Sequence, residues 1–251
     1  MIAGFSVLAL IPARAGSKRM PGKNVAPFAG RPLIQWTAAA AAASRFVDRV
    51  VVSSDCPEAI SAAVAAGAEA PFVRPSALAQ DDTGSADVVA HALEAMDRPF
   101  DIVVLLQPTS PLRTAEDIDA LVQLLVERRA PAALFVSAVD KPLAWIRTLA
   151  ASGELAPVAD AWPQPGAGAR LVRPNGAGYA VWTQRFAAER DFAPEGALGL
   201  ELPAARAFDI DTPEDFEIAE AVALYAERRR ATASSSAARI RDSLSPSKQP
   251  Q

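Results

Sequence analysis

The segment Phe5–Asn24, FSVLALIPARAGSKRMPGKN, joins an apolar run to a basic loop that contains two glycines. The run Phe5–Ile11 has the length and composition of a strand buried within a sheet. Four cationic side chains and both glycines then lie within the eleven residues from Arg14 to Asn24. Ligands of open α/β sheets bind beyond the carboxyl ends of the strands, and glycines let backbone N–H groups approach an anion. The segment therefore favours an α/β sheet whose first strand leads into a phosphate-binding loop.

The familiar phosphate-loop motifs do not fit this segment. A Walker A loop has four residues between its glycines, whereas five separate Gly16 from Gly22, and Asn24 replaces the required Ser or Thr. A dinucleotide-binding G-x-G-x-x-G pattern is absent. Composition alone leaves two interpretations open, a phosphate-binding loop and a solvated basic surface loop.

The rest of the chain alternates short apolar runs with longer helical segments. The run Ile102–Leu106, IVVLL, is typical of a strand buried on both faces of a sheet. Thr114 begins a helix and Asp117 follows three residues later, in the pattern of a capping box. Further strands are expected at Val50–Ser53, Glu69–Val73, Ala133–Val139, Gly178–Trp182 and Phe208–Asp211, and helices at Leu33–Ser44, Pro57–Gly67, Ser85–Asp97 and Thr212–Arg230. This alternation predicts an α/β fold, a Rossmann-like, doubly wound and mostly parallel sheet.

Two stretches depart from this rhythm. Residues 141–175 contain two tryptophans, several prolines and glycines, and no clear period, which indicates a small excursion that serves as a lid or a dimer arm. The tail 231–251, ATASSSAARIRDSLSPSKQPQ, has few large apolar groups, and we expect it to be disordered. The sequence thus predicts one domain over residues 1–230 and a disordered tail.

The overall composition excludes several classes of protein. With one cysteine, Cys56, the chain can form neither an internal disulfide framework nor a cysteine-rich zinc site. A net charge of −4 without a long basic face argues against a nucleic-acid partner. No apolar run approaches the ~18 residues of a membrane span, and no charge precedes the first run as it does in a signal peptide. We expect a cytoplasmic protein without a nucleic-acid or membrane partner.

A second candidate site lies near the end of the sheet. Asp209 and Asp211 flank Ile210, and residues two apart on a strand face the same side. Both carboxylates would then face the cleft while Ile210 enters the core. Two hard oxygen ligands suit Mg²⁺, with water and phosphate oxygens completing its shell. The alternative role for Asp211 is to cap the next helix. Because Thr212-Pro213 already make a helix start, we favour metal binding.

Five blocks of sequence, in order, carry a resemblance to a known family. They are IPARAGSKRMPGKN at 11–24, VRP with LAQD at 73–75 and 78–81, QPTSPLR at 107–113, RPNGA at 173–177 and DIDT at 209–212. The chain resembles the acidic-sugar cytidylyltransferases, the N-acylneuraminate cytidylyltransferase type. The resemblance extends over roughly residues 5–225 and implies the sheet of the nucleotide-diphospho-sugar transferases.

This resemblance implies a CTP-dependent nucleotidyltransferase that uses Mg²⁺, transfers CMP to an acidic acceptor and releases pyrophosphate. The CTP-binding residues that it implies are Ala13, Arg14, Gly16, Ser17, Lys23, Asn24, Arg74, Ser85 and Gln107. Arg14, Ser17 and Lys23 would hold the triphosphate. The expected catalytic residues are Arg14, Lys23, Asp209 and Asp211, of which the two acids would bind the metal.

Three of these residues also admit purely structural roles. Arg74 could be an ordinary surface arginine before a turn proline, and Ser85 is a good helix N-cap whatever else it does. Gln107 could satisfy backbone groups at a strand end. The resemblance, rather than the single residues, favours their part in a nucleotide site.

The acceptor implied by the resemblance is a nonulosonate sugar of the sialic-acid type. Relatives carry an Arg-Gln pair upstream of the Asn-Gly-Ala block, but Pro165 stands where that arginine belongs, so Arg170 or Arg173 is the candidate to replace it. The expected acceptor-binding residues are Gln107, Arg170, Arg173, Asn175, Tyr179 and Phe192. Core packing explains the two aromatic residues equally well.

Two alternatives to the sugar acceptor stay open. The excursion at 141–175 lacks the Arg-Gln pair and is rich in Gly, Ala and Pro, so it also suits a small phosphonate acceptor such as phosphonoformate. A protein that binds CTP without turnover is the alternative of another class, although the retention of Lys23 with both acids argues against it. The resemblance also implies a homodimer formed through residues 141–175, with Trp145 and Trp162 as anchors unless they pack into the chain's own core.

Overall fold

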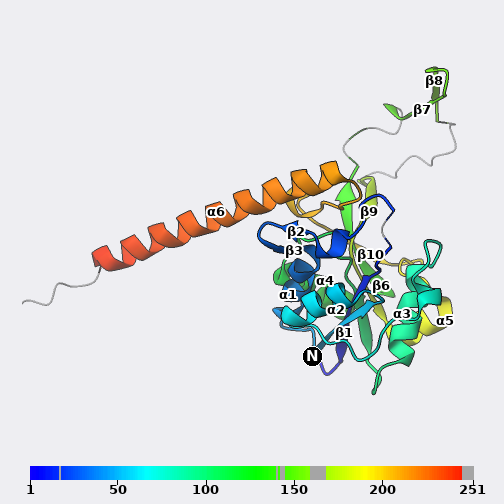
Figure 1. Cartoon of the computed structure of the whole chain (residues 1–251), viewed down its shortest axis with the longest axis horizontal. Coiled ribbons are helices and arrows are strands. Elements are labelled where there is room, and N and C mark those ends of the chain that lie inside the picture. Colours follow the sequence, from blue (N-terminus) through cyan, green and yellow to red (C-terminus); the bar gives the residue numbers. More distant parts are fainter. Residues whose placement is uncertain (17, 140, 142–144, 159–167, 245–251) are drawn as a thin grey trace, which may run out of the picture.

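A six-stranded sheet forms the centre of the computed structural model, which describes residues 1–16, 18–139, 141, 145–158 and 168–244. Its strands lie in the order β10–β6–β9–β5–β1–β4 (Figure 1). They are β1 (Val7–Ala13), β4 (Arg49–Ser54), β5 (Ile102–Leu105), β6 (Ala132–Ala138), β9 (Val172–Trp182) and β10 (Leu198–Glu201). The pairs β1–β4, β1–β5 and β10–β6 are parallel, whereas β9 is antiparallel to β5 and β6. The predicted mostly parallel α/β sheet is confirmed.

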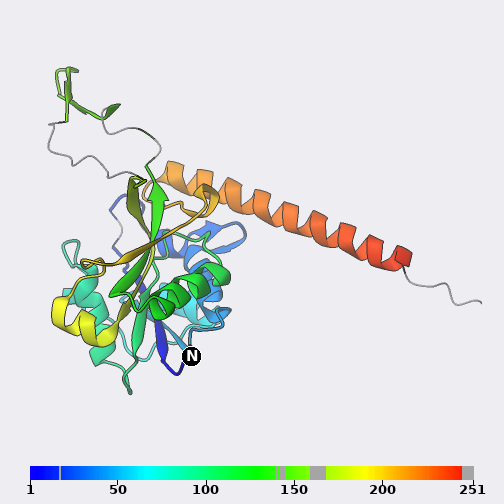
Figure 2. The ribbon, with the colours of Figure 1, turned by 180° about the vertical axis from the view of Figure 1, so that it is seen from behind.

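Helices cover both faces of this sheet. They are α1 (Leu33–Ala42), α2 (Pro57–Ala65), α3 (Ser85–Glu94), α4 (Ala115–Glu127), α5 (Thr183–Glu189) and α6 (Pro213–Leu244). One core cluster joins the sheet to α1, α2 and α4, and a second joins it to α3 and α5. Alternate residues of β1 enter the two clusters, because successive side chains of a strand point to opposite faces. Figures 1 and 2 show the two helical groups on either side of the sheet.

Short elements connect these layers. They are the 3-10 turns η1 (Lys23–Val25), η2 (Ser76–Leu78) and η4 (Ala204–Arg206) and the small pair β2 (Pro27–Phe28) and β3 (Arg31–Pro32). The capping box predicted at Thr114 and Asp117 is present at the start of α4. Ser85 is not an N-cap, because Gly84 takes that position and Ser85 is the first helical residue.

Several predicted strands differ in the structure. Phe208–Asp211 forms no strand, and the edge of the sheet is instead β10, which we did not predict. Glu69–Val73 contributes only an isolated bridge between Glu69 and Val51. Strand β9 begins at Val172 rather than Gly178, so that part of the predicted excursion belongs to the sheet.

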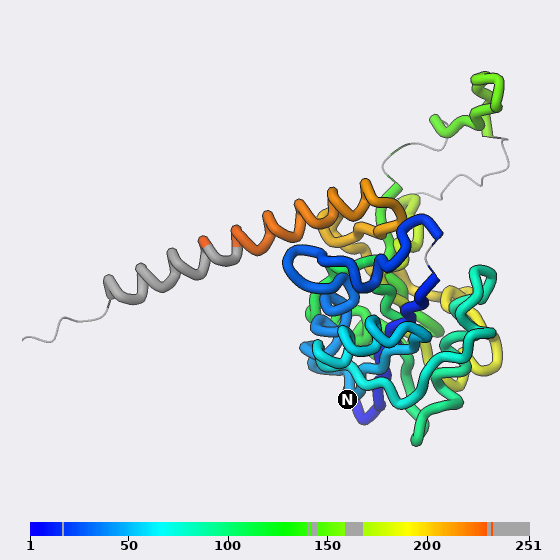
Figure 3. The backbone as a smooth tube through the Cα atoms, viewed as in Figure 1, coloured from blue at the N-terminus to red at the C-terminus, as the bar shows by residue number. Residues whose placement is uncertain are grey.

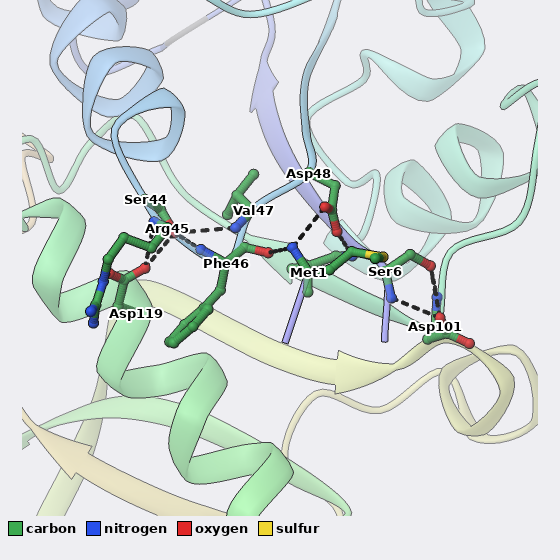
Figure 4. A network of polar contacts seen from close by, with 10 residues as sticks. Met1, Ser6, Ser44, Arg45, Phe46, Val47, Asp48, Asp101 and Asp119 are labelled. Atoms are coloured by element: carbon green, nitrogen blue, oxygen red, sulfur yellow. Dashed lines mark hydrogen bonds and ion pairs between the residues drawn. The ribbon is translucent and has the colours of Figure 1, made fainter. Parts of the chain in front are cut away.

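Polar contacts fix the chain at the amino end of β1 (Figure 4). The Met1 ammonium group donates to Asp48 Oδ1 at 2.7 Å, and Asp48 Oδ2 accepts the Val7 N–H at 2.8 Å. On the other side, Asp101 Oδ2 accepts the N–H and the hydroxyl of Ser6 at 2.8 and 2.7 Å. These bonds join the start of β1 to the segments before β4 and β5. They thereby help to fix the position of β1, whose carboxyl end leads into the basic loop.

The final helix α6 continues beyond its predicted end. Its first turns pack Phe216, Ala219 and Ala223 against Phe28 and Leu33, and the helix then extends away from the sheet to Leu244 (Figure 1). The helix therefore ends beyond the expected Arg230, and residues 231–244 continue it. That stretch contains no Gly or Pro, and extending an existing helix is far easier than nucleating one. Residues 245–251 lie outside the described part of the chain.

The excursion at 141–175 carries a two-stranded antiparallel hairpin. Its strands are β7 (Arg147–Leu149) and β8 (Leu155–Pro157), and the hairpin stands away from the sheet (Figures 1 and 2). The side chain of Trp145 is 70% exposed, which excludes its packing into the core of this chain. Trp162 lies outside the described residues. Within the described ranges, every helix is too short or too polar to cross a membrane.

Candidate active site

A pocket of about 490 Å³ lies at the carboxyl ends of β1 and β5. Its walls come from the basic loop after β1, the segment before α3, the turn after β5 and the start of α6. The lining residues are Pro12, Arg14, Lys18, Arg19, Lys23, Asn24, Arg74, Asp81, Thr83, Ser85, Val88, Gln107, Pro108, Thr109 and Asp211. The structure thus brings together six residues from four separate blocks, together with Ser85, which lies outside the blocks. The six are Arg14, Lys23, Asn24, Arg74, Gln107 and Asp211.

Lys23 lies at the join between the basic loop and the acidic segment. It begins η1 after Gly22, whose φ of 70° is a left-handed conformation that glycine adopts readily. The side chain is only 8% exposed, and its Nζ donates to the backbone carbonyl of Ile210. Burial lowers the pKa of Lys23, and the negative charges of Asp211 and Asp209 oppose that shift. A desolvated ammonium group therefore lines the pocket within electrostatic reach of both candidate metal ligands.

The acidic segment is held in place without being part of the sheet. The Ile210 N–H donates to the Thr109 carbonyl at 2.8 Å, and the Ile210 side chain is fully buried against Phe28 and Phe216. This anchor places Asp209 and Asp211 within electrostatic reach of Lys23, although the predicted strand is wrong. Figure 3 shows the basic loop running beside the start of α6. Arg19 of this loop bonds Asp211, which lies two residues before the helix.

The two acids differ in their surroundings. The pKa of Asp209 is raised, first by loss of hydration and then by the negative charge of Asp211. A hydrogen bond from Thr109 and the positive charges of Lys23 and Arg173 lower it, but by less. Asp211 accepts a hydrogen bond from Arg19 Nη1 at 3.0 Å and is more than half exposed. Like charges held this close favour a cation between them.

The other loop cations also meet carboxylates. Arg14 Nη1 and Lys18 Nζ contact the two oxygens of Asp81 at 2.6 and 2.5 Å. The loop itself is fixed by Asn24 Nδ2, which donates to the Arg14 carbonyl at 3.2 Å. Ala13 is the buried last residue of β1, and Gly16 lies in the loop without lining the pocket. Ser17 lies outside the described residues.

Arg74 and Gln107 line the pocket from two other segments of the chain. Arg74 is 4% exposed, donates from Nη2 to the Ser53 carbonyl at 2.6 Å, and has its pKa lowered by burial. It is therefore not an ordinary surface arginine. The Gln107 carbonyl accepts Arg113 Nη1 at 3.0 Å, whereas its side-chain Oε1 meets only the Thr109 hydroxyl, at 3.5 Å, among the described groups. The amide of Gln107 is thus available to a ligand in the pocket.

Sequence reasoning missed the part played by Arg113. Its guanidinium is fully buried and bonds the carbonyls of Gln107 and Ser110 at 3.0 and 2.7 Å. Burial lowers its pKa to about 9, which leaves it charged at neutral pH. Its place as the last residue of the block QPTSPLR was the available signal, because a charged residue ending a turn can satisfy the carbonyls of that turn.

The predicted acceptor residues separate into two groups. Arg173 and Tyr179 both interact electrostatically with Asp209, so they lie on its side of the site, and burial followed by that charge raises the pKa of Tyr179. In contrast, Arg170 bonds Glu201 at 2.6 Å, and the Phe192 ring packs on Phe186 within the second core cluster. Phe192 also packs against Tyr179, with ring centroids 5.6 Å apart, and none of these four residues lines the pocket.

Asn175 shapes the turn beside Asp209. It is buried, its Oδ1 accepts the Ala177 N–H at 3.1 Å, and its Nδ2 donates to Ser137 Oγ at 3.2 Å. Gly176 has a φ of +78°, and a Cβ there would lie 3.2 Å from Gln107 Oε1 and 3.3 Å from Asp209 Oδ2. A glycine is needed because the backbone passes directly against two site residues.

The donor set limits the metal that this site could hold. Among the described residues, no three His, Cys, Asp or Glu side chains are grouped so that they could hold a metal ion. Asp209 and Asp211 supply two carboxylates, and Mg²⁺ is commonly held by one or two carboxylates together with substrate phosphates and water. The residues therefore fit a metal that arrives with a nucleotide.

Comparison with known proteins agrees with this geometry. The sequence model of a family described as cytidylyltransferase matches residues 8–148. The CMP-N,N'-diacetyllegionaminic acid synthase of Legionella pneumophila is 34% identical over 223 residues, which cover 85% of this chain and 94% of that protein. The N-acylneuraminate cytidylyltransferase of Escherichia coli is 29% identical over 85% of this chain and 51% of its own length.

Solved structures of two other enzymes have a similar fold. The structure of a CMP:2-keto-3-deoxy-manno-octonic acid synthetase complexed with CTP superposes with a TM-score of 0.64 at 22% identity, over 89% of this chain and 99% of that one. The 4-diphosphocytidyl-2C-methyl-D-erythritol synthase of Anaerococcus prevotii gives 0.61 at 14% identity, over 88% of this chain and 96% of that one. These likenesses confirm the Rossmann-like sheet. Because the family model covers more than half of the chain and one relative matches along nearly its whole length, the chain belongs to the cytidylyltransferase family, a group of CTP-dependent nucleotidyltransferases.

Proposed function

We propose that this chain transfers CMP from CTP to a nonulosonate-type acidic sugar and releases pyrophosphate. The observation that carries the proposal is the meeting of Lys23 with the Asp209–Asp211 segment beside a pocket lined by basic residues. The names of the relatives support the sugar class, since they act on legionaminic acid and N-acylneuraminate. They give no support to the phosphonate alternative.

In this proposal the basic loop receives the triphosphate. Arg14, Lys18 and Arg19 line the pocket and can exchange their carboxylate partners for phosphate oxygens. The cytosine and ribose then face the wall that contains Arg74 and Ser85. The buried Lys23 lies deeper, where its charge is poorly screened and acts most strongly on the reacting phosphate.

The reaction is an in-line displacement at the α-phosphorus. A bond forms from the acceptor oxygen to that phosphorus while the bond to the pyrophosphate oxygen breaks. Lys23 stabilises the negative charge that develops on the α-phosphate, as preorganised charges do in other active sites. The chain's one histidine, His91, packs against Phe72 and does not line the pocket, so the acceptor proton passes to a carboxylate or to water.

Asp209 and Asp211 would hold Mg²⁺ together with the phosphate oxygens. When bound, Mg²⁺ neutralises phosphate charge and orients the leaving group. Arg19 has to release Asp211 for this purpose, and as an exposed partner it can then turn to the phosphates. The raised pKa of Asp209, caused first by lost hydration, is the state that a bound cation relieves.

The acceptor side of the site contains Arg173 and Tyr179. Arg173 is the candidate for the sugar carboxylate, because it acts on the Asp209 charge, whereas Arg170 is paired with Glu201. We further propose a homodimer formed through the hairpin β7–β8 and the preceding Trp145. The exposed apolar side chains of this segment include Trp145, Leu149 and Leu155. Contiguous exposed apolar groups of this kind mark interaction surfaces.

Pyrophosphate release tests the proposed reaction. The full chain is incubated with CTP and Mg²⁺ and, separately, with N-acetylneuraminic, legionaminic and pseudaminic acids, with 3-deoxy-manno-octulosonate, and with phosphonoformate. We expect release with at least one of the acidic sugars and none with phosphonoformate. Release with phosphonoformate alone would select the phosphonate alternative. CTP binding without release for any acceptor would instead select a protein without turnover.

A further inference from the structure

Asp81 joins the two walls of the pocket. It lies in the segment between η2 and α3, and its carboxylate contacts the basic loop. Its Oδ1 accepts Arg14 Nη1 at 2.6 Å, and its Oδ2 accepts Lys18 Nζ at 2.5 Å. All three residues line the pocket. One carboxylate thus holds two loop cations by one oxygen each.

This arrangement imitates a bound phosphate. A carboxylate that bridges two cations presents anionic oxygens to the same N–H donors that would otherwise bind phosphoryl oxygens. Hydrogen bonds from Lys18 and Arg14 hold the pKa of Asp81 below its usual value, so the carboxylate is ionised at neutral pH. While Asp81 holds these cations, their charge is compensated from within the chain.

We propose that Asp81 is an internal counter-ion that takes the place of phosphate in the free protein and makes the pocket selective for polyanions. The inference rests on the proposed binding of CTP by the basic loop. A triphosphate carries enough charge to displace one carboxylate from Arg14 and Lys18, whereas a weak single anion does not. The return of Asp81 to the same cations also favours the departure of pyrophosphate.

The substitution Asp81→Asn tests this role, because it keeps the side-chain size and removes the charge. Asp82→Asn is a matched control, since Asp82 is also exposed and forms no hydrogen bond or ion pair with the described residues of the basic loop. The affinities for CTP, inorganic pyrophosphate and cytidine are measured by titration calorimetry at low and high salt. Thermal unfolding of each variant establishes that the fold is retained.

The two exposed ion pairs set the size of the expected effect. Asp81→Asn should bind CTP and pyrophosphate about 2- to 30-fold more tightly than the unchanged chain, with the affinity for cytidine unaltered. High salt should reduce the gain, because it screens exposed charges. Asp82→Asn should show little gain in affinity for CTP or pyrophosphate. A purely structural role of Asp81 would change cytidine binding as well.

Other outcomes overturn the inference. They are unchanged or weaker binding of pyrophosphate by Asp81→Asn, an equal change for cytidine, or the same gain in Asp82→Asn. These outcomes can be separated from failure of the proposed function. If the unchanged chain does not bind CTP, the proposed function fails, whereas if it binds CTP and Asp81→Asn shows no gain, only the role of Asp81 fails.

Discussion

Lys23 is the single side chain on which the proposed chemistry depends most. It is buried, it bonds the Ile210 carbonyl, and it lies beside both candidate metal ligands. Lys23→Met keeps the length of the side chain and removes its charge. Loss of one preorganised charge-stabilising group commonly costs about 10²- to 10³-fold in kcat, and we expect a loss of that order in pyrophosphate release.

Lys18→Met is the matched control for this substitution. Lys18 is a cation of the same loop, but its side chain is 79% exposed and pairs with the exposed Asp81. We expect it to change the apparent affinity for CTP while leaving kcat within a few-fold of the unchanged chain. Equal losses of kcat in both variants would show that the loop supplies charge in general and that Lys23 has no special place.

Single residues also show where sequence patterns suffice and where they do not. The resemblance of five blocks identified the pocket residues, and most of them meet there. The burial of Arg74 and the pairing of Arg14 with Asp81 depend on which backbone groups and carboxylates lie nearby in space. Separations of tens of residues along the chain hide those neighbours from any local pattern.

The link between α1 and α4 rests on one buried carboxylate. Asp119 accepts hydrogen bonds from Ser44 Oγ at 2.7 Å, from the Arg45 N–H at 2.9 Å and from Arg45 Nε at 2.8 Å (Figure 4). Asp119→Ala leaves these donors without their partner. A bond to a charged group contributes about 1.5–3 kcal/mol, but contributions are not additive, and the Arg45 side chain is 73% exposed, so its ion pair is largely screened. We therefore expect the free energy of unfolding to fall by about 2–4 kcal/mol at pH 7.

The same residue predicts a pH dependence of stability. Burial alone would raise the pKa of Asp119, but the bonds from Arg45 and Ser44 outweigh it, and the net pKa lies below the ordinary 3.8. A folded pKa below the unfolded one means that the stabilisation is complete above the unfolded pKa and is lost as pH falls through the folded one. Urea unfolding should therefore separate Asp119→Ala from the unchanged chain clearly at pH 7 and less at pH 3. A difference that stays constant with pH would contradict this assignment.

Among the elements, strong local signals were predicted correctly and weak ones were missed. The capping box of α4 and the apolar run of β5 are determined by adjacent residues. Strand β10 is four residues long, contains Gly199 and lies at the sheet edge, so it has almost no local signature. The segment 208–211 looks like a strand because it alternates, but the backbone of Ile210 pairs with Thr109 in a turn instead of with a sheet strand.

At the scale of the whole molecule, the parallel sheet assembles the site. The carboxyl ends of β1 and β5 lie side by side, which brings the basic loop next to the turn that begins at Gln107. The antiparallel β9 carries Arg173 and Tyr179 to the same region from the opposite direction. Fold class therefore followed from the alternation of elements, whereas the placement of the acidic segment required the tertiary packing of Ile210.

The exposed hairpin predicts the state of association. Leu149 and Leu155 are paired across β7 and β8, and their side chains are 72% and 68% exposed. The double substitution Leu149→Asp with Leu155→Asp should convert a dimer into a monomer in sedimentation equilibrium, because burying unpaired charges is costly. Ala151→Asp, which adds a charge at the hairpin turn, should leave the dimer intact. A monomeric unchanged chain, or a dimer that survives the double substitution, would contradict the proposed arm.

The convergence of Lys23 with Asp209 and Asp211 on one metal-bound nucleotide is tested most directly by the Mg²⁺ dependence of CTP binding. Titration calorimetry is carried out with and without Mg²⁺ on the unchanged chain, on Lys23→Met, on the double variant Asp209→Asn/Asp211→Asn, and on all three changes combined. We predict that Mg²⁺ tightens CTP binding to the unchanged chain but not to the double variant, and that the Lys23 and acid changes are coupled by about 0.5–3 kcal/mol. An undiminished Mg²⁺ effect in the double variant, with additive losses, would contradict the account.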